Sequence, residues 1–214
     1  MARLISLKDM NVRQRIFERI YRTSPEVESL PWHRDEPHHL LKQAAAAAAN
    51  PGRALDVGCG EGVSSTYLAK LGYSVVGIDF VTGALAAAQR EAERAGVTVD
   101  FVLADVLDYR STEPFDLVVD SGCLHNLPKR LHDRYRSRLY EWLAAGGSFV
   151  LVHFTHRPAI GWVPQGPNHL RRQQVETLFS ELHLSAYNET QYDVPLPMGK
   201  MRAGVYWFTR PVAS

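Results

Sequence analysis

The sequence predicts an α/β fold: a doubly wound, mostly parallel seven-stranded sheet with helices on both faces and a C-terminal antiparallel hairpin. Short apolar runs alternate with segments of helical periodicity from Arg53 onward, which is the pattern of a parallel sheet covered by helices. A glycine-rich turn, Gly58–Gly62, follows the first apolar run. The last two extended segments, 184–192 and 201–210, have no helix between them, which favours an antiparallel pair at the sheet edge.

The composition is that of an ordinary globular protein. The chain has 214 residues, 45% of them hydrophobic and 22% charged, so it can bury a full core and we expect one domain over residues 1–214. The formal net charge of +1 argues against nucleic acid or an anionic membrane as main partner and favours a small substrate. Cys59 and Cys123 are too few for a disulfide framework, and no stretch approaches the ~20 apolar residues of a membrane span, so a cytoplasmic protein is expected.

The residues before the first strand are expected to form two helices joined by a loop. Residues 11–22 place apolar side chains on one face and charged side chains on the other, which indicates an amphipathic helix. Prolines exclude regular structure throughout 28–37, so Trp32 and His33 are expected in a loop. The alanine run in 38–49 has the highest helix propensity available and ends at an Asn-Pro-Gly stop.

Strands and helices then follow in a regular order. We interpret short apolar runs that end at or near an acidic residue as strands, and runs with an apolar stripe at helical spacing as helices. The basic face of the helix at 129–145 is expected to be solvated. The predicted strands are 54–57, 74–79, 97–103, 115–120, 148–153, 184–192 and 201–210, and the predicted helices between them are 63–70, 84–95, 129–145 and 170–182.

The glycine turn indicates a place where a ligand approaches the backbone. A dinucleotide-binding turn reads G-x-G-x-x-G, but here the third glycine comes one position early, at Gly62, and Val63 stands where that pattern needs glycine. Asp56 closes an otherwise buried strand. It needs a polar partner, for which a bound ligand is one candidate, because an unpaired buried carboxylate is costly.

Acidic and aromatic residues follow the next strands, at the edge where open parallel sheets bind ligands. Asp79 lies roughly 20 residues after the glycines, the separation at which an acid accepts both hydroxyls of a ribose. Phe80 offers a face for a purine. Asp105 is placed to accept an exocyclic amine of adenine, with backbone amides around Val106 completing recognition of the base edge. Helix capping explains any one of these acids, but not the whole set at successive strand ends.

Four segments together carry a family resemblance: Leu55–Gly62, Val76–Asp79, Ala104–Asp105 and Phe115–Asp120. They resemble the first to fourth motifs of class I S-adenosylmethionine-dependent methyltransferases, and the similarity extends over residues 53–210. The resemblance implies that S-adenosyl-L-methionine is the cofactor, that the glycine-turn amides approach its methionine part, and that the terminal strands form an antiparallel hairpin. The residues expected to bind the cofactor are Asp56, Gly58, Cys59, Gly60, Asp79, Phe80, Ala104, Asp105, Val106 and Asp120.

A narrower resemblance concerns residues 120–127 together with Pro31 and Trp32. These are similar to small-molecule methyltransferases related to the thiopurine S-methyltransferases and the tellurite-resistance methyltransferases. Asp120-Ser-Gly-Cys differs from the Pro-Pro-Tyr signature of amino-methylases acting on DNA bases or glutamine. No metal is expected, because we find no acidic pair beyond the cofactor set. Residues 1–50 are expected to supply N-terminal helices and a lid, and residues 53–210 the cofactor-binding core.

Candidate catalytic residues are histidines after the strands, because a base that removes the acceptor's proton near neutral pH suits methylation. His125 is the leading candidate and His153 the second, although a purely hydrogen-bonding role fits His125 as well. Cys123 is interpreted as packing, since direct displacement needs no nucleophile on the protein. The acceptor is expected to contact the N-terminal segment and the loop 155–168, through Tyr21, Trp32, His33, His156 and Trp162.

Three functions compete at this stage. The favoured one is transfer of a methyl group from S-adenosylmethionine to an oxygen, nitrogen or sulfur of a small molecule. A catalytically silent module that binds the same cofactor is the alternative. A nicotinamide-dependent oxidoreductase is disfavoured by the glycine spacing and by Asp56. The identity of the acceptor and the oligomeric state stay open.

Overall fold

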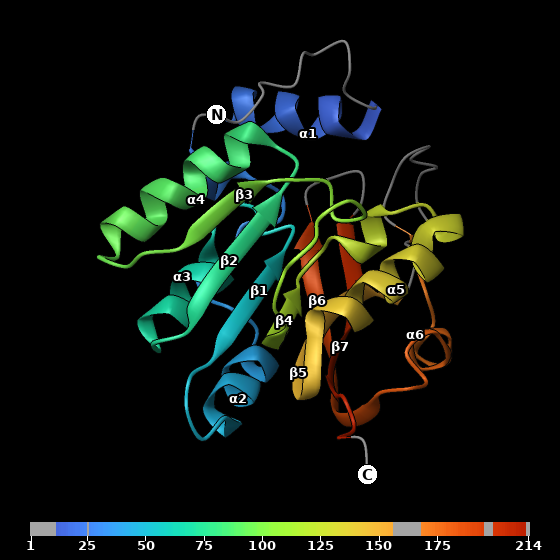
Figure 1. Ribbon diagram of the computed structural model, residues 1–214. Coiled ribbons are helices and arrows are strands. Elements are labelled where there is room, and N and C mark those ends of the chain that lie inside the picture. The colour runs from blue at the N-terminus through green and yellow to red at the C-terminus, as the bar shows by residue number, and fades with distance from the viewer. Residues whose placement is uncertain (1–11, 25, 156–167, 195–198, 213–214) are drawn as a thin grey trace.

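A single seven-stranded sheet forms the centre of the computed structural model, which describes residues 12–24, 26–155, 168–194 and 199–212 (Figure 1). The strand order is β3-β2-β1-β4-β5-β7-β6. The first five strands are mutually parallel, whereas β7 runs antiparallel to both β5 and β6. This confirms the predicted fold class, including the terminal hairpin. The strands are β1 Arg53–Val57, β2 Ser74–Asp79, β3 Asp100–Leu103, β4 Phe115–Asp120, β5 Leu143–Phe154, β6 His183–Val194 and β7 Gly199–Thr209.

Helices cover both faces of the sheet. Helices α2, α3 and α4 pack on one face and α5 and α6 on the other, while α1 lies beyond the carboxyl ends of the strands, next to α4 (Figure 1). The helices are α1 Val12–Thr23, α2 His39–Ala47, α3 Val63–Lys70, α4 Thr82–Arg94, α5 His132–Trp142 and α6 Arg172–Leu178, with short 3₁₀ turns η1 Val27–Ser29, η2 Leu124–Asn126 and η3 Lys129–Leu131.

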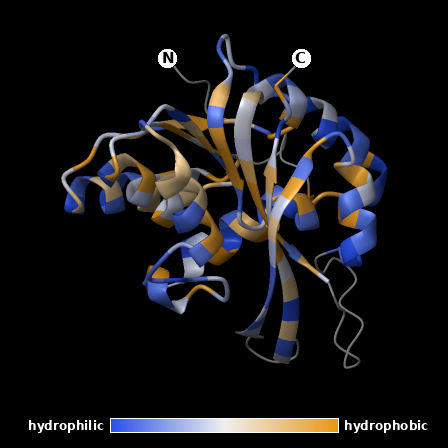
Figure 2. Ribbon diagram, turned by 90° about the horizontal axis from the view of Figure 1, so that it is seen from below, coloured by the Kyte–Doolittle hydropathy of each residue, from blue (hydrophilic) through white to orange (hydrophobic). Residues whose placement is uncertain are grey.

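Alternation along the strands builds two cores. Successive side chains of a strand point to opposite faces, so Leu55 and Val118 pack toward α5 and α6 while Ala54 and Leu117 pack toward α2 and α3. Trp142 is the largest fully buried side chain and closes the first of these cores. Figure 2 shows hydrophobic residues concentrated along the central strands and hydrophilic residues on the outer helices. No helix in the described part of the chain is long and apolar enough to cross a membrane.

The junction between α5 and β5 differs from the prediction. We expected a helix over 129–145 and a turn at the glycine pair before a strand at 148. Instead the helix ends at Trp142 and β5 begins at Leu143, which pairs with Phe115. The register between β4 and β5 then shifts, and Gly146 takes a φ of 77° inside the strand. The glycines therefore serve a bulge, which a positive-φ residue accommodates, rather than a helix-to-strand turn.

The predicted strand at 97–103 is also shorter than expected. β3 begins at Asp100, because the preceding residues close helix α4: the Val97 amide donates to the Ala92 carbonyl at 3.0 Å and the Gly96 amide donates to the Glu93 carbonyl at 3.1 Å. Gly96 has a φ of 69°, the conformation with which helices often end.

The glycine turn yields a stability prediction. Gly62 has a φ of 84°, and a Cβ there would lie 2.9 Å from the Ala88 Cβ, whereas Gly96 has a similar φ of 69° and open space around its Cβ position. Both alanine variants incur about 1–2 kcal/mol of backbone strain. Gly62→Ala adds about 1–3 kcal/mol of overpacking between α3 and α4. Urea unfolding should therefore show a larger loss for Gly62→Ala than for the control Gly96→Ala. Equal losses would contradict the close helix contact.

Candidate functional site

The carboxyl ends of the parallel strands bring the predicted ligand-binding residues to one edge of the sheet. Val57, at the end of β1, pairs with both Ile78 and Asp120, and Asp79 pairs with Leu103. The loops that follow β1, β2, β3 and β4 are therefore neighbours. In open α/β sheets this edge is where ligands bind.

The glycine turn after β1 is held by the strand beside it. The Cys59 amide donates to the Ile78 carbonyl at 3.0 Å, and the Gly60 amide donates to Asp79 Oδ2 at 3.0 Å. Gly58 has a φ of 67°, and a Cβ there would lie 3.0 Å from the Cys123 Cβ. Glycine is thus required both for the turn and for the close approach of the loop after β4. The Cys59 side chain is buried, and burial raises the pKa of its thiol well above the ordinary value, which leaves it neutral.

Asp79 is the carboxylate best suited to a ligand. It accepts the Gly60 amide with Oδ2 and the Val81 amide with Oδ1, the latter at 2.9 Å. Each oxygen therefore keeps acceptor capacity for one further donor, which is what a pair of ribose hydroxyls requires. Burial raises the pKa of Asp79 to about 6. Donors from a ligand would favour the ionised form and oppose this shift.

Asp56 and Asp120 have partners inside the protein. Asp56 Oδ2 accepts a hydrogen bond from the Ser65 hydroxyl at 2.6 Å, so helix α3 rather than a ligand supplies the polar partner that this buried carboxylate needs. Burial raises the pKa of Asp56 to about 7. Asp120 is fully buried and accepts four donors, from the amides of Gly122, Cys123 and Leu124 and from the Tyr135 hydroxyl. Each oxygen accepts two of these donors, and the side chain thereby shapes the loop that carries His125, while a cofactor contact of Asp120 stays a prediction.

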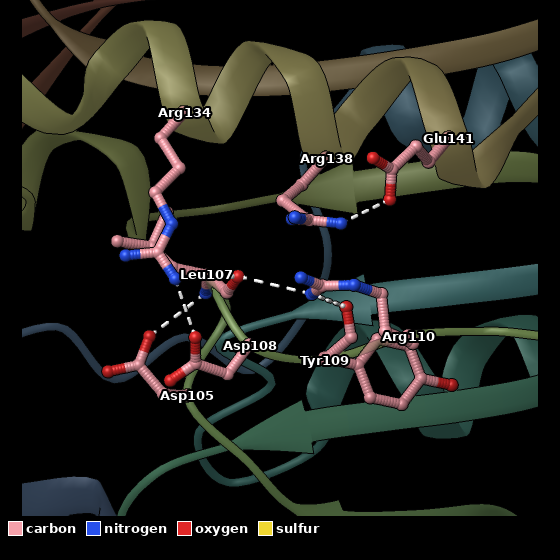
Figure 3. Close-up of polar contacts among 8 residues, drawn as sticks. All are labelled: Asp105, Leu107, Asp108, Tyr109, Arg110, Arg134, Arg138 and Glu141. Carbon is pink, nitrogen blue, oxygen red and sulfur yellow. Dashed lines mark hydrogen bonds and ion pairs between the residues drawn. The ribbon is translucent and has the colours of Figure 1, made fainter.

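The segment after β3 forms a compact turn packed on α5 (Figure 3). The Ala104 amide donates to the Asp79 carbonyl at 2.9 Å, which joins this segment to β2. Asp105 Oδ1 accepts the Leu107 amide at 2.9 Å, and Arg134 on α5 donates to Asp108 at 2.6 Å. Asp105 itself is only half-buried, which leaves it available at the binding edge. The Val106 side chain is buried in the core, so only its backbone can serve a ligand.

Aromatic residues from the N-terminal segment cover the glycine turn. The Tyr21 hydroxyl lies 3.1 Å from the position that a Cβ of Gly60 would take, and Trp32 Nε1 donates to that hydroxyl at 3.4 Å. Phe17 contacts both Trp32, with ring centroids 5.5 Å apart, and Phe80, at 5.9 Å. Tyr21 and Trp32, expected to contact the acceptor, therefore lie over the glycine turn and Phe80. They lie above the predicted cofactor residues.

Two polar contacts that were not predicted from the sequence hold the segment with Phe17, Tyr21 and Trp32 in place over the glycine turn. His33 Nδ1 lies 2.7 Å from Glu61 Oε1 inside the glycine turn, and Glu18 Oε1 accepts the Thr82 amide at 2.8 Å at the start of α4. The Glu61 side chain is only 10% exposed, and burial raises its pKa. The acidic residue within the glycine turn, Glu61, is the sequence signal from which such a partner could have been predicted.

The two candidate catalytic histidines lie close together. Their ring centroids are 5.8 Å apart, and the His125 ring also contacts Phe154 at 4.4 Å. Burial lowers the pKa of His125 well below 6.5 and that of His153 to about 4, so both rings are neutral near pH 7. His153 is fully buried and its Nδ1 lies 2.9 Å from the Phe154 carbonyl. His125 is therefore the better placed of the two to meet a ligand.

Other predicted and unforeseen residues complete the edge. His156, Trp162 and most of the loop 155–168 lie outside the described residues. The Phe154 ring contacts His169 at 6.2 Å and Tyr192 at 6.0 Å, two residues that were not predicted from the sequence to belong to the site. No group of three or more potential metal ligands occurs within the described residues.

The glycine turn and Asp79 together fit a nucleoside-containing cofactor. Among the described residues, leaving out its chain neighbours, the Tyr21 hydroxyl alone lies within 4 Å of the position that a Cβ of Gly60 would take, at 3.1 Å. Asp79 presents spare acceptors directly beside it, and Phe80 supplies an adjacent ring. The residues present therefore fit S-adenosylmethionine, for which Asp79 is the predicted ribose ligand and the glycine turn the predicted neighbour of the methionine part.

Comparisons with known proteins agree with this geometry. Residues 54–147 match the family model described as a methyltransferase domain. The chain is 30% identical over 146 residues to the 2-heptyl-1-hydroxyquinolin-4(1H)-one methyltransferase of Mycobacteroides abscessus, a match that covers 66% of this chain and 64% of that protein. It spans 46% to 64% of the length of the first curated relatives it matches.

Solved structures share the fold. The 1,6-didemethyltoxoflavin-N1-methyltransferase of Burkholderia thailandensis, solved with 1,6-didemethyltoxoflavin and S-adenosylhomocysteine, aligns with a TM-score of 0.74 at 20% identity and covers 99% of this chain and 93% of that one. TehB from Haemophilus influenzae aligns with a TM-score of 0.70 at 20% identity, over 81% of this chain and 62% of that one. The chain thus shares the fold of these structures, and its residues 54–147 are similar to a methyltransferase domain.

Proposed function

We propose that this protein transfers the methyl group of S-adenosylmethionine to an oxygen, nitrogen or sulfur atom of a small molecule. The observation that carries the proposal is the hydrogen bond from the Gly60 amide to Asp79 Oδ2, which holds the proposed ribose-binding carboxylate beside the glycine turn. The cofactor supplies a methyl group on a positively charged sulfur. When bound, it would donate this methyl group to a nucleophilic atom of the acceptor, and His125 would take up the acceptor's proton.

The chain's part is to orient the two reactants and exclude water. Asp79 and Asp105 hold the nucleoside, and the glycine turn lies against the methionine part. Tyr21 and Trp32 cover the turn, and the His33–Glu61 contact keeps this cover in place. The acceptor enters from the side of β4 and β5, where His125 and Phe154 lie.

A small acceptor suits the charge distribution better than nucleic acid. The arginines of α5, which would be the natural basic surface, are engaged in ion pairs: Arg134 with Asp108, Arg136 with Asp133, and Arg138 with Glu141 (Figure 3 shows the first and the last). A face neutralised in this way offers little attraction to phosphates. The matched curated relative is named for a small heteroaromatic substrate, which points in the same direction.

The general base of the proposed reaction is His125. Its ring is neutral near pH 7 and so is ready to accept a proton, and Phe154 stacks beside it as a surface for the acceptor. His153 lies behind it and supports the ring rather than meeting the acceptor. A silent module would bind the cofactor in the same way, and only turnover separates the two functions.

Cofactor binding is tested with Asp79→Asn. The amide keeps the size of the carboxylate but loses its charge and half of its acceptor capacity, so affinity for S-adenosylhomocysteine should fall by about tenfold or more. The measurement is the ligand-induced rise in melting temperature, compared for each variant with its own unliganded value. Asp100→Asn, which changes an exposed carboxylate at the opposite end of β3, is the control and should bind normally. An unchanged ligand-induced shift in Asp79→Asn would refute the ribose role.

The role of His125 is tested by pH dependence, using an acceptor found by screening with labelled methyl donor. Burial lowers its pKa well below 6.5, so wild-type turnover should rise with pH only in the range below 6.5 and be level from pH 7 upward. His125→Gln should lower the turnover number by ~10²-fold and remove that rise, with little change in cofactor affinity. His183→Gln, an exposed histidine at the start of β6, is the control. A glutamine variant with most of the activity and the same pH profile would rule out His125 as the base.

A further inference from the structure

We propose that Arg34 binds a carboxylate of the acceptor, and that the substrates are planar aromatic molecules carrying an acidic group on the side away from the methylated atom. This inference rests on the proposed function, because it concerns the acceptor part of the same site. Neither Arg34 nor the ring beneath it was singled out by the sequence.

A continuous row of rings leads from His125 to Arg34. The His125 and Phe154 rings are 4.4 Å apart and 38° from parallel, and the Phe154 ring meets Tyr192 edge-on at 6.0 Å. Above the Tyr192 ring lies the Arg34 guanidinium carbon, 3.9 Å from the ring centroid. The row joins the loop after β4, the end of β5 and the end of β6. Such a wall favours a flat aromatic ligand over an aliphatic one.

Arg34 is held in place at its backbone while its side chain reaches the row of rings. The preceding residue, His33, lies with its ring Nδ1 2.7 Å from Glu61 Oε1 in the glycine turn, which fixes the backbone next to Arg34. The side chain crosses from there to Tyr192 on β6. The guanidinium of this exposed residue therefore lies over the Tyr192 end of the row of rings, where it can bind an anionic group of an acceptor.

The charge of Arg34 lacks a protein partner among the side chains that the structure describes. The nearest acidic residues along the chain are engaged elsewhere, Asp35 with His33 at 3.4 Å and Glu36 with Lys42. Burial, together with His39 and Arg34, lowers the pKa of His38 to about 4, so that ring is neutral near pH 7 and adds no charge. Arg34 therefore supplies positive charge beside the Tyr192 ring.

Stacking on Tyr192 suits a guanidinium for anion recognition. The guanidinium carbon lies 3.9 Å from the Tyr192 centroid, and a guanidinium that packs on a ring by its flat face keeps its N–H donors for hydrogen bonds. These donors match the two oxygens of a carboxylate, a geometry that lysine cannot reproduce. A neutral amide of the same shape would lose the charge-assisted part of the interaction.

The experiment compares matched acids and amides as ligands: 4-hydroxyquinoline-2-carboxylate with its carboxamide, and 2-hydroxybenzoate with its carboxamide. Binding is measured by calorimetry to the full chain saturated with S-adenosylhomocysteine. We expect at least one acid to bind the wild-type protein about tenfold more tightly than its amide, as one charge-assisted contact provides. Arg34→Gln should reduce that preference to about one, Arg34→Lys should keep part of it, and the control Arg90→Gln, which changes an exposed residue of α4, should keep all of it.

Two results would overturn the inference: neither acid binds wild type better than its amide, or Arg34→Gln keeps the preference. Tyr192→Leu removes the stacking surface without touching the charge, and it should weaken acid binding less than Arg34→Gln does. Binding of S-adenosylhomocysteine is measured separately for each variant. If the wild-type protein does not bind S-adenosylhomocysteine, the proposed function itself is contradicted. If it binds S-adenosylhomocysteine normally but shows no preference for the acids, only the role of Arg34 is contradicted.

Discussion

The carboxylates buried at the carboxyl ends of the strands each need hydrogen-bond donors. The source of these donors decides which carboxylate keeps acceptor capacity for a ligand. Asp120 saturates both oxygens within its own loop and with Tyr135, which makes that loop rigid and positions His125. Asp56 takes the Ser65 hydroxyl and so ties β1 to α3. Asp79 takes one amide on each oxygen, and this incomplete satisfaction is what makes it a ligand group rather than a structural one.

The N-terminal segment changes the electrostatics of this edge. With Tyr21 over the glycine turn, Asp79 is 9% exposed, and the resulting desolvation raises the pKa of that carboxylate to about 6. The same exclusion of water strengthens any hydrogen bond that a ligand makes there. The His33–Glu61 and Glu18–Thr82 contacts fasten the segment at two separate places. The cover is thus joined to the turn that it protects.

The two parts of the site differ in character. The cofactor part is polar and is built from successive strand ends, so its positions recur at each strand of a parallel sheet. The proposed acceptor part is aromatic and consists of Phe154, Tyr192 and His125, which come from β5, β6 and the loop after β4. Arg34 comes from yet another segment, before the sheet begins. Changes at these positions leave the cofactor part intact, which lets one scaffold accept different acceptors.

Local sequence determined the strands and helices, the glycine turn and the acids at strand ends, because periodicity and turn chemistry act over a few residues. Tertiary structure decided which of those acids remain open to a ligand. Asp56, Asp79 and Asp120 have similar settings in the chain, but their donors come from α3, the glycine turn and α5. It also ended α5 at Trp142, since pairing of Leu143 with Phe115 outweighed helix propensity. The stacking of Arg34 on Tyr192 joins residues 158 positions apart (34 and 192), a contact that no local pattern encodes and only the packing of the N-terminal segment on the terminal hairpin creates.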